Sequence, residues 1–320
     1  MFGIRELKDL IRVTETKVEC PIRGCVEEVL MQRKSFKRLN EFKCKTHNIY
    51  ISTSTFEYEN KLKNILWKDE TDRKLLNRIR RVKRESRIAR DNSEDAVTWN
   101  IFRFLEKNQL LGGFLEYLIK KPIENPEVIY WSYSQLQKDT WPSLKAAREE
   151  FETLPKKGSE PDIIIKSNSH IFFVEAKLTA TNNTLPRSRK PEVRKKYEMG
   201  GNQWYQNLVL SDFVTIAVTD RKYELLRFWL LGSWIAHQLD LDYCLINLVL
   251  SEREKTIEED FRKHIRVDSR NSFLRTTWEE IYHFVSENAS ESPEKSKMTE
   301  YFRNKTLGYK NRRLQKAFLT

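Results

Sequence analysis

The feature that most constrains the fold is a pair of short apolar runs, residues 162–166 and 170–178, which are joined by the polar turn sequence SNSH. Two such runs flanking a tight turn predict a β-hairpin. Folding the chain about the midpoint between Asn168 and Ser169 places Asp162 directly opposite Glu175. Because side chains alternate between the two faces of a strand, Asp162, Glu175 and Lys177 then share one face of the hairpin. Charged residues are depleted on strands this apolar, so their presence indicates a specific role.

These three charges fit a site for a divalent cation. Two carboxylates that face each other across a strand pair, with Cβ atoms about 5 Å apart, repel unless a cation or a proton lies between them. Carboxylates, water and phosphate oxygens are the ligands that Mg²⁺ prefers, and a neighbouring lysine can orient or deprotonate an attacking water. The competing interpretation is an ordinary solvated charged surface, which the apolar flanks IIIK and IFFV argue against.

The order Pro161-Asp162, a gap of twelve residues, and then Glu175-Ala176-Lys177 resembles the signature of the PD-(D/E)XK nuclease superfamily. The resemblance covers roughly residues 93–220. It implies a restriction-endonuclease-like core of mixed α/β (α+β) class, with a helix, three strands, a helix and a strand. It also implies that Asp162, Glu175 and the backbone carbonyl of Ala176 hold Mg²⁺ or Mn²⁺, while Lys177 serves the hydrolytic water.

The expected order of elements agrees with that core. A helix is predicted from Ser93 as N-cap, ending at Gly112 and Gly113. Strands are predicted near residues 128–133, 162–166, 170–178, 213–219 and 243–250, and helices near residues 202–210 and 223–239.

The same resemblance adds two candidate residues. Family members often carry an acid on the first helix, and Glu94 is the matching position, on the apolar stripe of Val97 and Ile101. The competing interpretation is a first-turn glutamate that interacts with the helix dipole. Gln203 follows the third strand, where members often carry Gln, Lys or Tyr. Asn207 occupies the tyrosine position of the Gln-x3-Tyr branch, so the sequence departs from that branch.

A separate motif lies near the N-terminus, where Cys20, Cys25, Cys44 and His47 form the spacing C-x4-C-x18-C-x2-H. Two ligand pairs of this kind predict a tetrahedral Cys3His zinc site with no open catalytic position, hence a structural Zn²⁺. The alternative is three buried cysteines and a surface histidine. A short segment with few large apolar residues needs such a metal to fold.

The charge of the chain indicates a polyanionic partner. The formal net charge is +12, and residues 72–90 contain nine basic and two acidic residues. A second basic stretch lies in the polar segment 179–199, expected to be a long irregular loop. The candidate phosphate contacts are Arg80, Arg81, Lys83, Arg84, Arg187, Arg189, Lys190 and Lys195. A solvated helix face is the alternative for the first group.

The chain divides, on this interpretation, into four consecutive segments: a zinc module (1–55), a basic helical connector (56–92), a nuclease-like domain (93–285), and a polar linker with a basic tail (286–320). No export signal is visible, and the most apolar stretch, residues 225–236, is too short to span a bilayer. A cytoplasmic protein without a membrane partner is therefore expected. Its oligomeric state is undetermined, and a homodimer is one option.

Together these features predict a Mg²⁺-dependent deoxyribonuclease, of a type used in restriction, defence or DNA processing. The main alternative is a non-catalytic, zinc-containing nucleic-acid-binding protein whose nuclease-like fold is inert. A third hypothesis is an RNA-directed nuclease or a transcription-linked factor, since the sequence does not distinguish DNA from RNA.

Overall fold

The computed structural model describes residues 1–32, 36–83, 86–188 and 190–320, so the expected contacts Arg84 and Arg189 lie outside the described residues. The chain forms two compact units. Unit 1 contains Met1–Asp72, Ser86–Asn108 and Glu279–Thr320, and unit 2 contains Arg73–Glu85 and Gln109–Trp278. This division differs from the four consecutive segments expected, because residues 86–108 and 279–320 group with the N-terminal residues.

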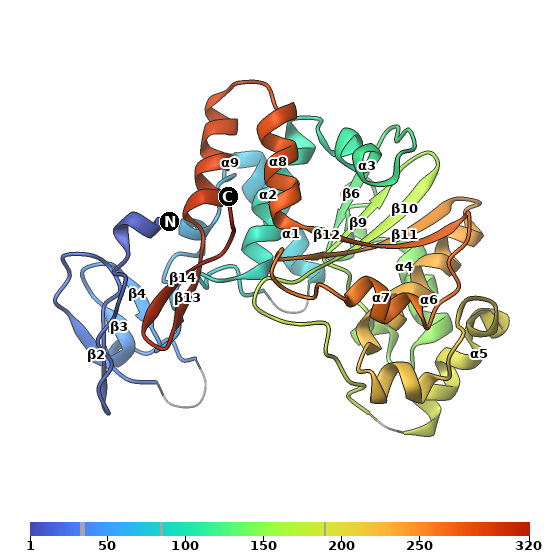
Figure 1. The fold of residues 1–320 in the computed structure, drawn as a ribbon, viewed down its shortest axis with the longest axis horizontal. Helices are drawn as coiled ribbons and strands as arrows, with labels where there is room; N and C mark the ends of the chain where they lie inside the picture. Colours follow the sequence, from blue (N-terminus) through green and yellow to red (C-terminus); the bar gives the residue numbers. More distant parts are fainter. Residues whose placement is uncertain (33–35, 84–85, 189) are drawn as a thin grey trace. The chain divides into compact units, whose positions relative to one another are not determined.

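Unit 2 is built on a mixed sheet of seven strands in the order β12-β11-β10-β9-β6-β7-β8 (Figure 1). Strands β10, β11 and β12 are parallel, whereas β9, β6, β7 and β8 join by antiparallel pairing. The strands are β6 (Glu127–Tyr130), β7 (Tyr133–Ser134), β8 (Asp139–Thr140), β9 (Ile163–Lys166), β10 (His170–Ala176), β11 (Asp242–Val249) and β12 (Asn271–Thr277). The expected mixed α/β fold class is confirmed.

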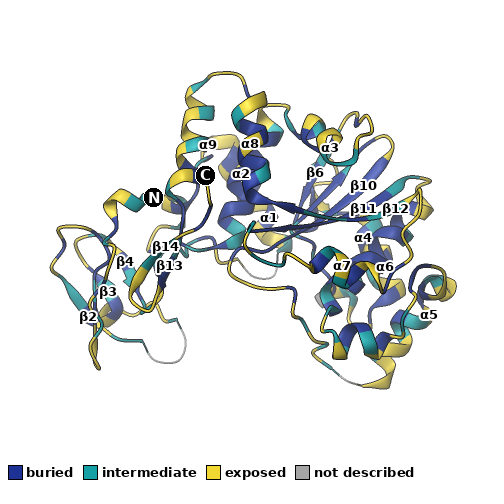
Figure 2. Ribbon diagram, viewed as in Figure 1, coloured by how far each residue is buried: buried dark blue, intermediate teal, exposed yellow. Residues whose placement is uncertain are grey.

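The predicted hairpin is present with the predicted register. Ile163 pairs with Val174 and Lys166 with Ile171, so the pairing is centred between Asn168 and Ser169. Every residue of β10 is buried, which Figure 2 shows as dark blue along the central strands. Asp162 lies one residue before β9, and Lys177 one residue after β10.

One face of this sheet packs against helices of the same unit. These are α4 (Pro142–Phe151), α5 (Pro191–Leu208), η5 (Thr215–Thr219), α6 (Tyr223–Gln238) and α7 (Ile257–Arg262). The unit also contains α3 (Leu111–Ile119) and η4 (Pro155–Lys157). A hydrophobic core on this face joins strand residues such as Ile164, Ile171 and Phe173 to Phe228 and Leu231 of α6. This is the sheet face on which Glu175 was expected, so that face is buried under helices.

Unit 1 contains, among the described residues, three small antiparallel sheets, together with helices from the N-terminal third and from the C-terminal part of the chain. Its elements are η1 (Ile4–Glu6), β1 (Lys17–Glu19), β2 (Glu28–Leu30), η2 (Asn40–Phe42), β3 (Lys43–Cys44), β4 (Ile49–Ile51), β5 (Phe56–Tyr58), η3 (Lys61–Asn64), α2 (Glu94–Lys107), α8 (Trp278–Asn288), α9 (Pro293–Asn304), β13 (Thr306–Lys310) and β14 (Arg313–Lys316). The remaining helix, α1 (Glu70–Val82), runs from unit 1 into unit 2.

Several local predictions were wrong. Residues 213–219 are not a strand, because Asp212 accepts hydrogen bonds from the N–H groups of Val214 and Thr215 and so starts the π-helical η5. Helix α2 starts at the predicted N-cap Ser93 but ends at Lys107, before the two glycines, which lie in α3. The break follows from Gln109, whose φ of 57° interrupts the helix.

Two further segments are more ordered than expected. The loop 179–199 contains the first part of α5, which begins at Pro191 and is interrupted by non-helical backbone at residues 200–203. The segment 286–320, expected to be a polar linker and a basic tail, contains the end of α8, all of α9 and the strands β13 and β14. Ser292 caps α9 by accepting from the N–H of Lys295, and Pro293 occupies the first turn, where its missing N–H costs nothing.

Among the described residues, none of the helices combines the length and the apolar character that crossing a bilayer requires.

Candidate active site and metal centre

The Cys3His motif is assembled by two tight turns of unit 1. Cys20 and Cys25 flank the turn between β1 and β2, and Gly24 adopts a φ of 75° there, which a glycine tolerates without strain. Cys44 ends β3, and a turn closed by the hydrogen bond from Asn48 N–H to the Cys44 carbonyl places His47 beside it. The sequence spacing therefore brings all four side chains to one point.

The four ligand atoms lie within 4.8 Å of one another, close enough to bind one metal ion. The Sγ atoms of Cys25 and Cys44 are 3.9 Å apart, and His47 Nδ1 lies 3.7 Å from Cys20 Sγ and 3.4 Å from Cys44 Sγ. Tetrahedral zinc, with Zn–S of about 2.3 Å and Zn–N of about 2.0 Å, separates S···S by about 3.8 Å and S···N by about 3.5 Å. These three distances are close to those of a zinc tetrahedron.

The electrostatics of the cluster favour a cation. Burial, followed by the nearby Glu27 carboxylate, raises the pKa of Cys44 to about 12 in the metal-free chain, and burial also raises the pKa of Cys20. Glu27 stabilises the turn that contains His47 by accepting hydrogen bonds from the N–H groups of Lys45, at 2.9 Å, and Thr46, at 3.3 Å. Hydrogen bonds from Thr46, Cys44 and these N–H groups lower the pKa of Glu27 to about 2. Metal binding at this cluster must therefore release thiol protons.

The second candidate site lies at the ends of β9 and β10. Asp162 is held by three hydrogen bonds: its Oδ2 accepts from Ala176 N–H at 2.9 Å, its Oδ1 accepts from the indole N–H of Trp131 at 3.2 Å, and its carbonyl accepts from Trp131 N–H at 3.1 Å. The backbone of Ala176, expected to offer its carbonyl to a metal, thus also donates its N–H to the first carboxylate. Asp162 and Ala176 are brought together as the hairpin register predicts.

Glu175 and Lys177 meet in the same place. Lys177 Nζ donates to Glu175 Oε1 and, at 2.7 Å, to Glu224 Oε2, so one buried ammonium is shared by two carboxylates. Glu175 is 4% exposed and Lys177 is 7% exposed. The lysine is further fixed through its backbone, because its N–H bonds to the Leu248 carbonyl and its carbonyl accepts from the indole N–H of Trp278.

The two glutamates differ in their electrostatics. Burial raises the pKa of Glu175 well above its usual value, and the charges of Glu224 and Asp162 add to that effect against the opposing effect of Lys177. Burial also acts to raise the pKa of Glu224, but Lys177 outweighs it and the pKa is lowered. Without a metal, Glu175 is therefore the one of these two glutamates that holds a proton more readily.

Glu224 is a site residue that the sequence reasoning missed. It lies in the first turn of α6, and its backbone N–H donates to Thr184 Oγ1 at 2.9 Å. A signal was available, because Glu224 and Arg227 stand one turn apart on an otherwise apolar helix. Arg227 donates to Ser159 Oγ at 2.8 Å, so this turn of α6 contacts both Lys177 and the loop that precedes Asp162.

Two other expected residues lie on elements outside the hairpin. Glu94 lies in the first turn of α2, which belongs to unit 1, so its place in a metal site with Asp162 and Glu175 stays a prediction. Gln203 is exposed and has a φ of 63° in the break of α5. Among the described residues, the Cys3His cluster is the one group of three or more Cys, His, Asp or Glu side chains whose ligand atoms are close enough to share an ion. At the hairpin end, Asp162 accepts hydrogen bonds from Trp131 and Ala176, and Glu175 accepts one from Lys177.

Comparison with protein-family models, curated proteins and solved structures found no match.

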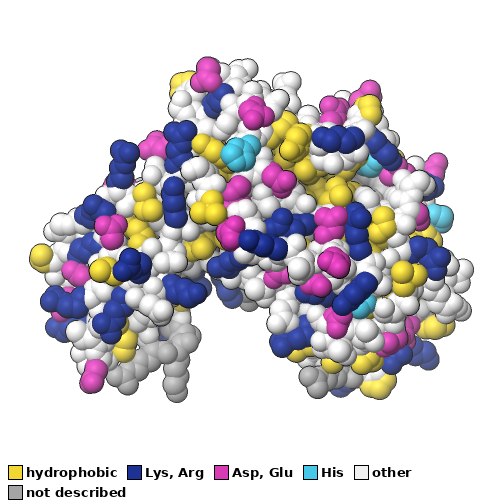
Figure 3. Space-filling view, in the orientation of Figure 1, with side chains coloured by type: hydrophobic (Ala, Val, Ile, Leu, Met, Phe, Trp, Pro, Cys, Tyr) yellow, Lys and Arg dark blue, Asp and Glu magenta, His cyan; other side chains and the backbone are white. Residues whose placement is uncertain are grey.

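The candidate phosphate contacts are mostly accessible. Exposed side chains are those of Arg80 and Arg81 at the end of α1, Arg187 before α5, and Lys190 and Lys195 at the start of α5. Lys83 is half-buried, with its ammonium 4.4 Å from the centre of the Trp131 ring. Figure 3 shows Lys and Arg side chains interspersed with acidic ones on the visible face. These cations do not form a single unbroken patch there.

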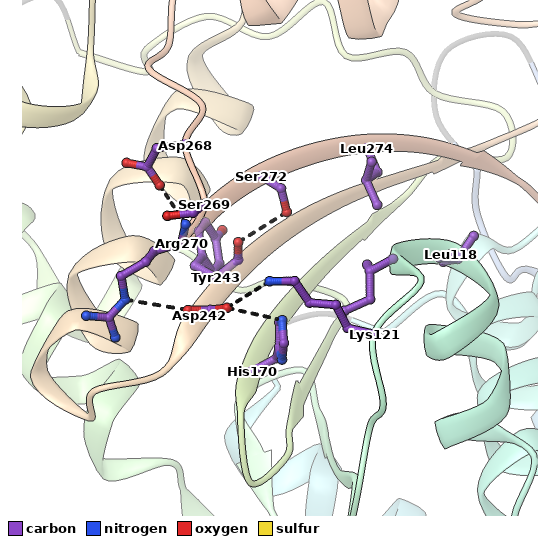
Figure 4. Close-up of a pocket in the computed structure, with 11 residues that line it drawn as sticks. Leu118, Lys121, His170, Asp242, Tyr243, Asp268, Ser269, Arg270, Ser272 and Leu274 are labelled. Atoms are coloured by element: carbon purple, nitrogen blue, oxygen red, sulfur yellow. Dashed lines mark hydrogen bonds and ion pairs between the residues drawn. The ribbon is translucent and has the colours of Figure 1, made fainter.

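A polar pocket lies at the opposite end of β10 from Glu175. Asp242 at the start of β11 accepts from Lys121 at 3.1 Å and lies 3.5 Å from both His170 and Arg270 (Figure 4). Tyr243 and Leu274 contribute to the lining of this cavity of about 380 Å³. Since the two acids and two permanent cations of the lining balance, the pocket has no charge preference that would identify a ligand.

The electrostatics of Glu175 predict a stability effect. A raised pKa means that the folded state binds a proton more tightly than the unfolded state, so stability is greatest below the usual value of 4.5 and is lost as pH rises through the folded value. Each pKa unit corresponds to about 1.4 kcal/mol. Glu175→Gln, which cannot ionise, should therefore raise the free energy of unfolding at pH 8 by about 1 kcal/mol or more, with a smaller gain near pH 5.

Urea unfolding of the zinc-loaded, magnesium-free protein at both pH values measures this effect. Glu252→Gln is the matched control, because the Glu252 side chain is 66% exposed. A Glu175→Gln gain that is equal at the two pH values, or a loss at pH 8, would contradict the electrostatic account.

Proposed function

We propose that the protein is a nuclease of the PD-(D/E)XK type that hydrolyses DNA phosphodiester bonds with Mg²⁺ or Mn²⁺. One observation carries the proposal: the register of β9 and β10 brings Asp162 and Glu175 to the same end of the hairpin, with Lys177 buried against Glu175. Burying three charges at the end of a strand pair costs desolvation energy, and clusters of ionisable groups of this kind are typical of functional sites.

The donor set fits a hard divalent cation. Carboxylate oxygens of Asp162 and Glu175 and the carbonyl of Ala176 are oxygen ligands, which Mg²⁺ prefers. The raised pKa of Glu175 supports the same conclusion, because a cation would replace the proton that the buried carboxylate otherwise retains. Glu175 would have to exchange its contact with Lys177 for the metal. Glu94 stays a proposed additional ligand, to be tested by its own variant.

The bound cation would polarise the scissile phosphate and lower the pKa of its water. Hydrolysis forms a bond from the water oxygen to phosphorus and breaks the bond from phosphorus to one ester oxygen. Lys177 would orient that water and offset the negative charge that develops. Glu224 would keep Lys177 cationic and in place when Glu175 turns to the metal, because it remains a 2.7 Å partner.

We assign the Cys3His cluster to one structural Zn²⁺, since its four ligands leave no open position. Thiolate ligands persist where cysteines stay reduced, and the four cysteines of this chain are free. These features support a cytoplasmic protein. Basic residues at the end of α1 and the start of α5 would contact the nucleic-acid backbone.

One observation favours a second candidate, a non-catalytic nucleic-acid-binding protein. The carboxylates at the hairpin end are satisfied by Lys177, Trp131 and Ala176, as they would be in a site that never binds a metal. Under this alternative the protein binds DNA with a steep salt dependence and leaves it whole.

Incubation of the purified, zinc-loaded protein with circular DNA, linear DNA, single strands and RNA, each with and without Mg²⁺ or Mn²⁺, distinguishes the candidates. Nicked or linear products from circular DNA would identify an endonuclease, and loss of linear DNA alone an exonuclease. If the protein cleaves RNA and leaves DNA intact, its substrate is RNA and not DNA. If every substrate stays intact both with and without metal while the protein binds DNA, the second candidate is supported.

The basic residues at the end of α1 predict that DNA affinity depends on salt concentration. Replacing Arg80 and Arg81 by Gln should weaken DNA binding and reduce the log-log slope of affinity against salt by up to about 2, because each phosphate contact contributes about 0.9. Fluorescence anisotropy across a salt series measures the slope. The control is a double replacement of the exposed Lys255 and Arg266. If the two doubles change the slope equally, the end of α1 is ordinary charged surface.

A further inference from the structure

The turn between β6 and β7 has an unusual composition for its geometry. Trp131 and Ser132 form the two-residue loop, closed by the pair Tyr130 and Tyr133, and their φ angles are 44° and 81°. A hairpin loop with positive φ at both positions usually contains Asn or Gly, because other side chains are strained there. A tryptophan at such a position indicates that its side chain is needed for something other than the turn.

The side chain of Trp131 is directed at the candidate metal ligand. It is fully buried, and its indole N–H donates to Asp162 Oδ1 at 3.2 Å. Ala176 N–H donates to Oδ2 at 2.9 Å, so each carboxylate oxygen has one fixed donor. The backbone of the strained residue is bound too, through Trp131 N–H to the Asp162 carbonyl at 3.1 Å.

Two donors on opposite oxygens prevent rotation of the Asp162 carboxylate about its Cβ–Cγ bond. Each carboxylate oxygen has two lone pairs, so accepting an N–H does not by itself prevent the same oxygen from binding a cation, and the two donors fix the orientation in which it would do so. Partners that orient a metal ligand in this way are worth about 10- to 100-fold in metal affinity.

We propose that Trp131 is a positioning residue that presents the Asp162 carboxylate to a divalent cation. This inference rests on the proposed function, in which Asp162 is a ligand. The strain of the turn is then the cost of bringing an indole N–H to Asp162 from the neighbouring hairpin. Removing the N–H should weaken metal binding while leaving the chemical step unchanged once the metal is bound.

The test is Trp131→Phe, which keeps an aromatic ring and removes the donor. Trp229→Phe is the matched control, because Trp229 is equally buried in unit 2 and its N–H bonds to the Leu208 carbonyl at 3.2 Å. Binding of Mn²⁺ to the zinc-loaded protein is measured by calorimetry, with the cleavage rate at saturating Mn²⁺ as a second readout. If Trp131→Phe disturbs folding, the tryptophan analogue benzothienylalanine is placed at position 131 instead, because it replaces only the indole N–H by sulfur.

We expect Trp131→Phe to weaken Mn²⁺ binding at least about tenfold while the control binds as the parent does, with the rate at saturation retained in both. Parent-like Mn²⁺ affinity in Trp131→Phe, when Asp162→Ala has lost it, overturns the inference and leaves the proposed function standing. Equal effects of both Trp variants also overturn it, since they would report general loss of packing. If the parent and Asp162→Ala bind Mn²⁺ alike, the proposed function fails, and the inference fails with it.

Discussion

We expect Lys177→Met to abolish the proposed DNA cleavage and to leave DNA binding intact. We expect a rate loss of about a hundred- to ten-thousand-fold, the range for removing a group that handles a proton or a developing charge. Methionine retains most of the length of the buried side chain, whereas Lys177→Ala would also leave a cavity. Lys177 is not among the expected metal ligands, so Mn²⁺ binding should survive the change. Cleavage and DNA binding are measured on the same preparation, with Lys166→Met in β9 as the control.

The same variant has a distinctive stability signature. Without Lys177, Glu175 and Glu224 lose their shared cation, and leaving a buried charge without its partner costs up to about 3–5 kcal/mol. A divalent cation would then have no ammonium to displace from Glu175. Mg²⁺ should therefore raise the melting temperature of Lys177→Met by more than it raises that of the parent. Cleavage at the parental rate, or no stabilisation by Mg²⁺, would contradict the role given to this lysine.

We expect Cys44→Ser to abolish zinc binding at the Cys3His cluster and to unfold the sheets around it. Structural zinc contributes about 10–16 kcal/mol of apparent binding free energy in small domains, which are unfolded without it. Unit 2 has its own core and should keep its melting transition. The zinc content of the purified protein should fall from one ion per chain to near zero.

The structure predicts that the loss extends to the C-terminus. Tyr309 of β13 belongs to the same apolar cluster as Cys20, Cys25 and Cys44, and its hydroxyl donates to the Lys8 carbonyl at 2.8 Å. Hydrogen exchange should therefore accelerate in β13 and β14 as well as in β3 to β5. Cys244→Ser is the control, because Cys244 is equally buried but lies in β11 of unit 2. Retained zinc, or protected amides in β13 after its loss, would contradict this account.

The parts of the site that could be predicted are those encoded by short-range patterns. Alternation and the midpoint of the turn define the register that pairs Ile163 with Val174, and hence the opposition of Asp162 and Glu175. Cysteine spacing defines the Cys3His cluster for the same reason, since each ligand pair lies within one tight turn. In both cases the geometry follows from a few consecutive residues.

The parts that could not be predicted depend on tertiary packing. Glu224 reaches Lys177 across 47 residues of chain, and nothing in the hairpin sequence indicates which helix will cover it. The Trp131 turn violates the usual residue preferences of its own conformation, so local rules argue against it. The run 213–219 is apolar and β-branched, yet the cap at Asp212 makes it helical. Tyr309 of β13 packs in the apolar cluster that contains Cys20, Cys25 and Cys44. This contact joins residues far apart in the sequence, so local patterns do not predict it either.

The most direct test of the central claim is the rate of DNA cleavage by the zinc-loaded parent and its Asp162→Ala variant under Mg²⁺, and again under Mn²⁺, with DNA binding measured alongside. The account predicts metal-dependent cleavage by the parent and a loss of at least about a hundredfold in the variant, with DNA affinity unchanged. Equal cleavage by the two proteins, or no cleavage by the parent on any nucleic acid, would contradict the assignment of the hairpin end as an active site.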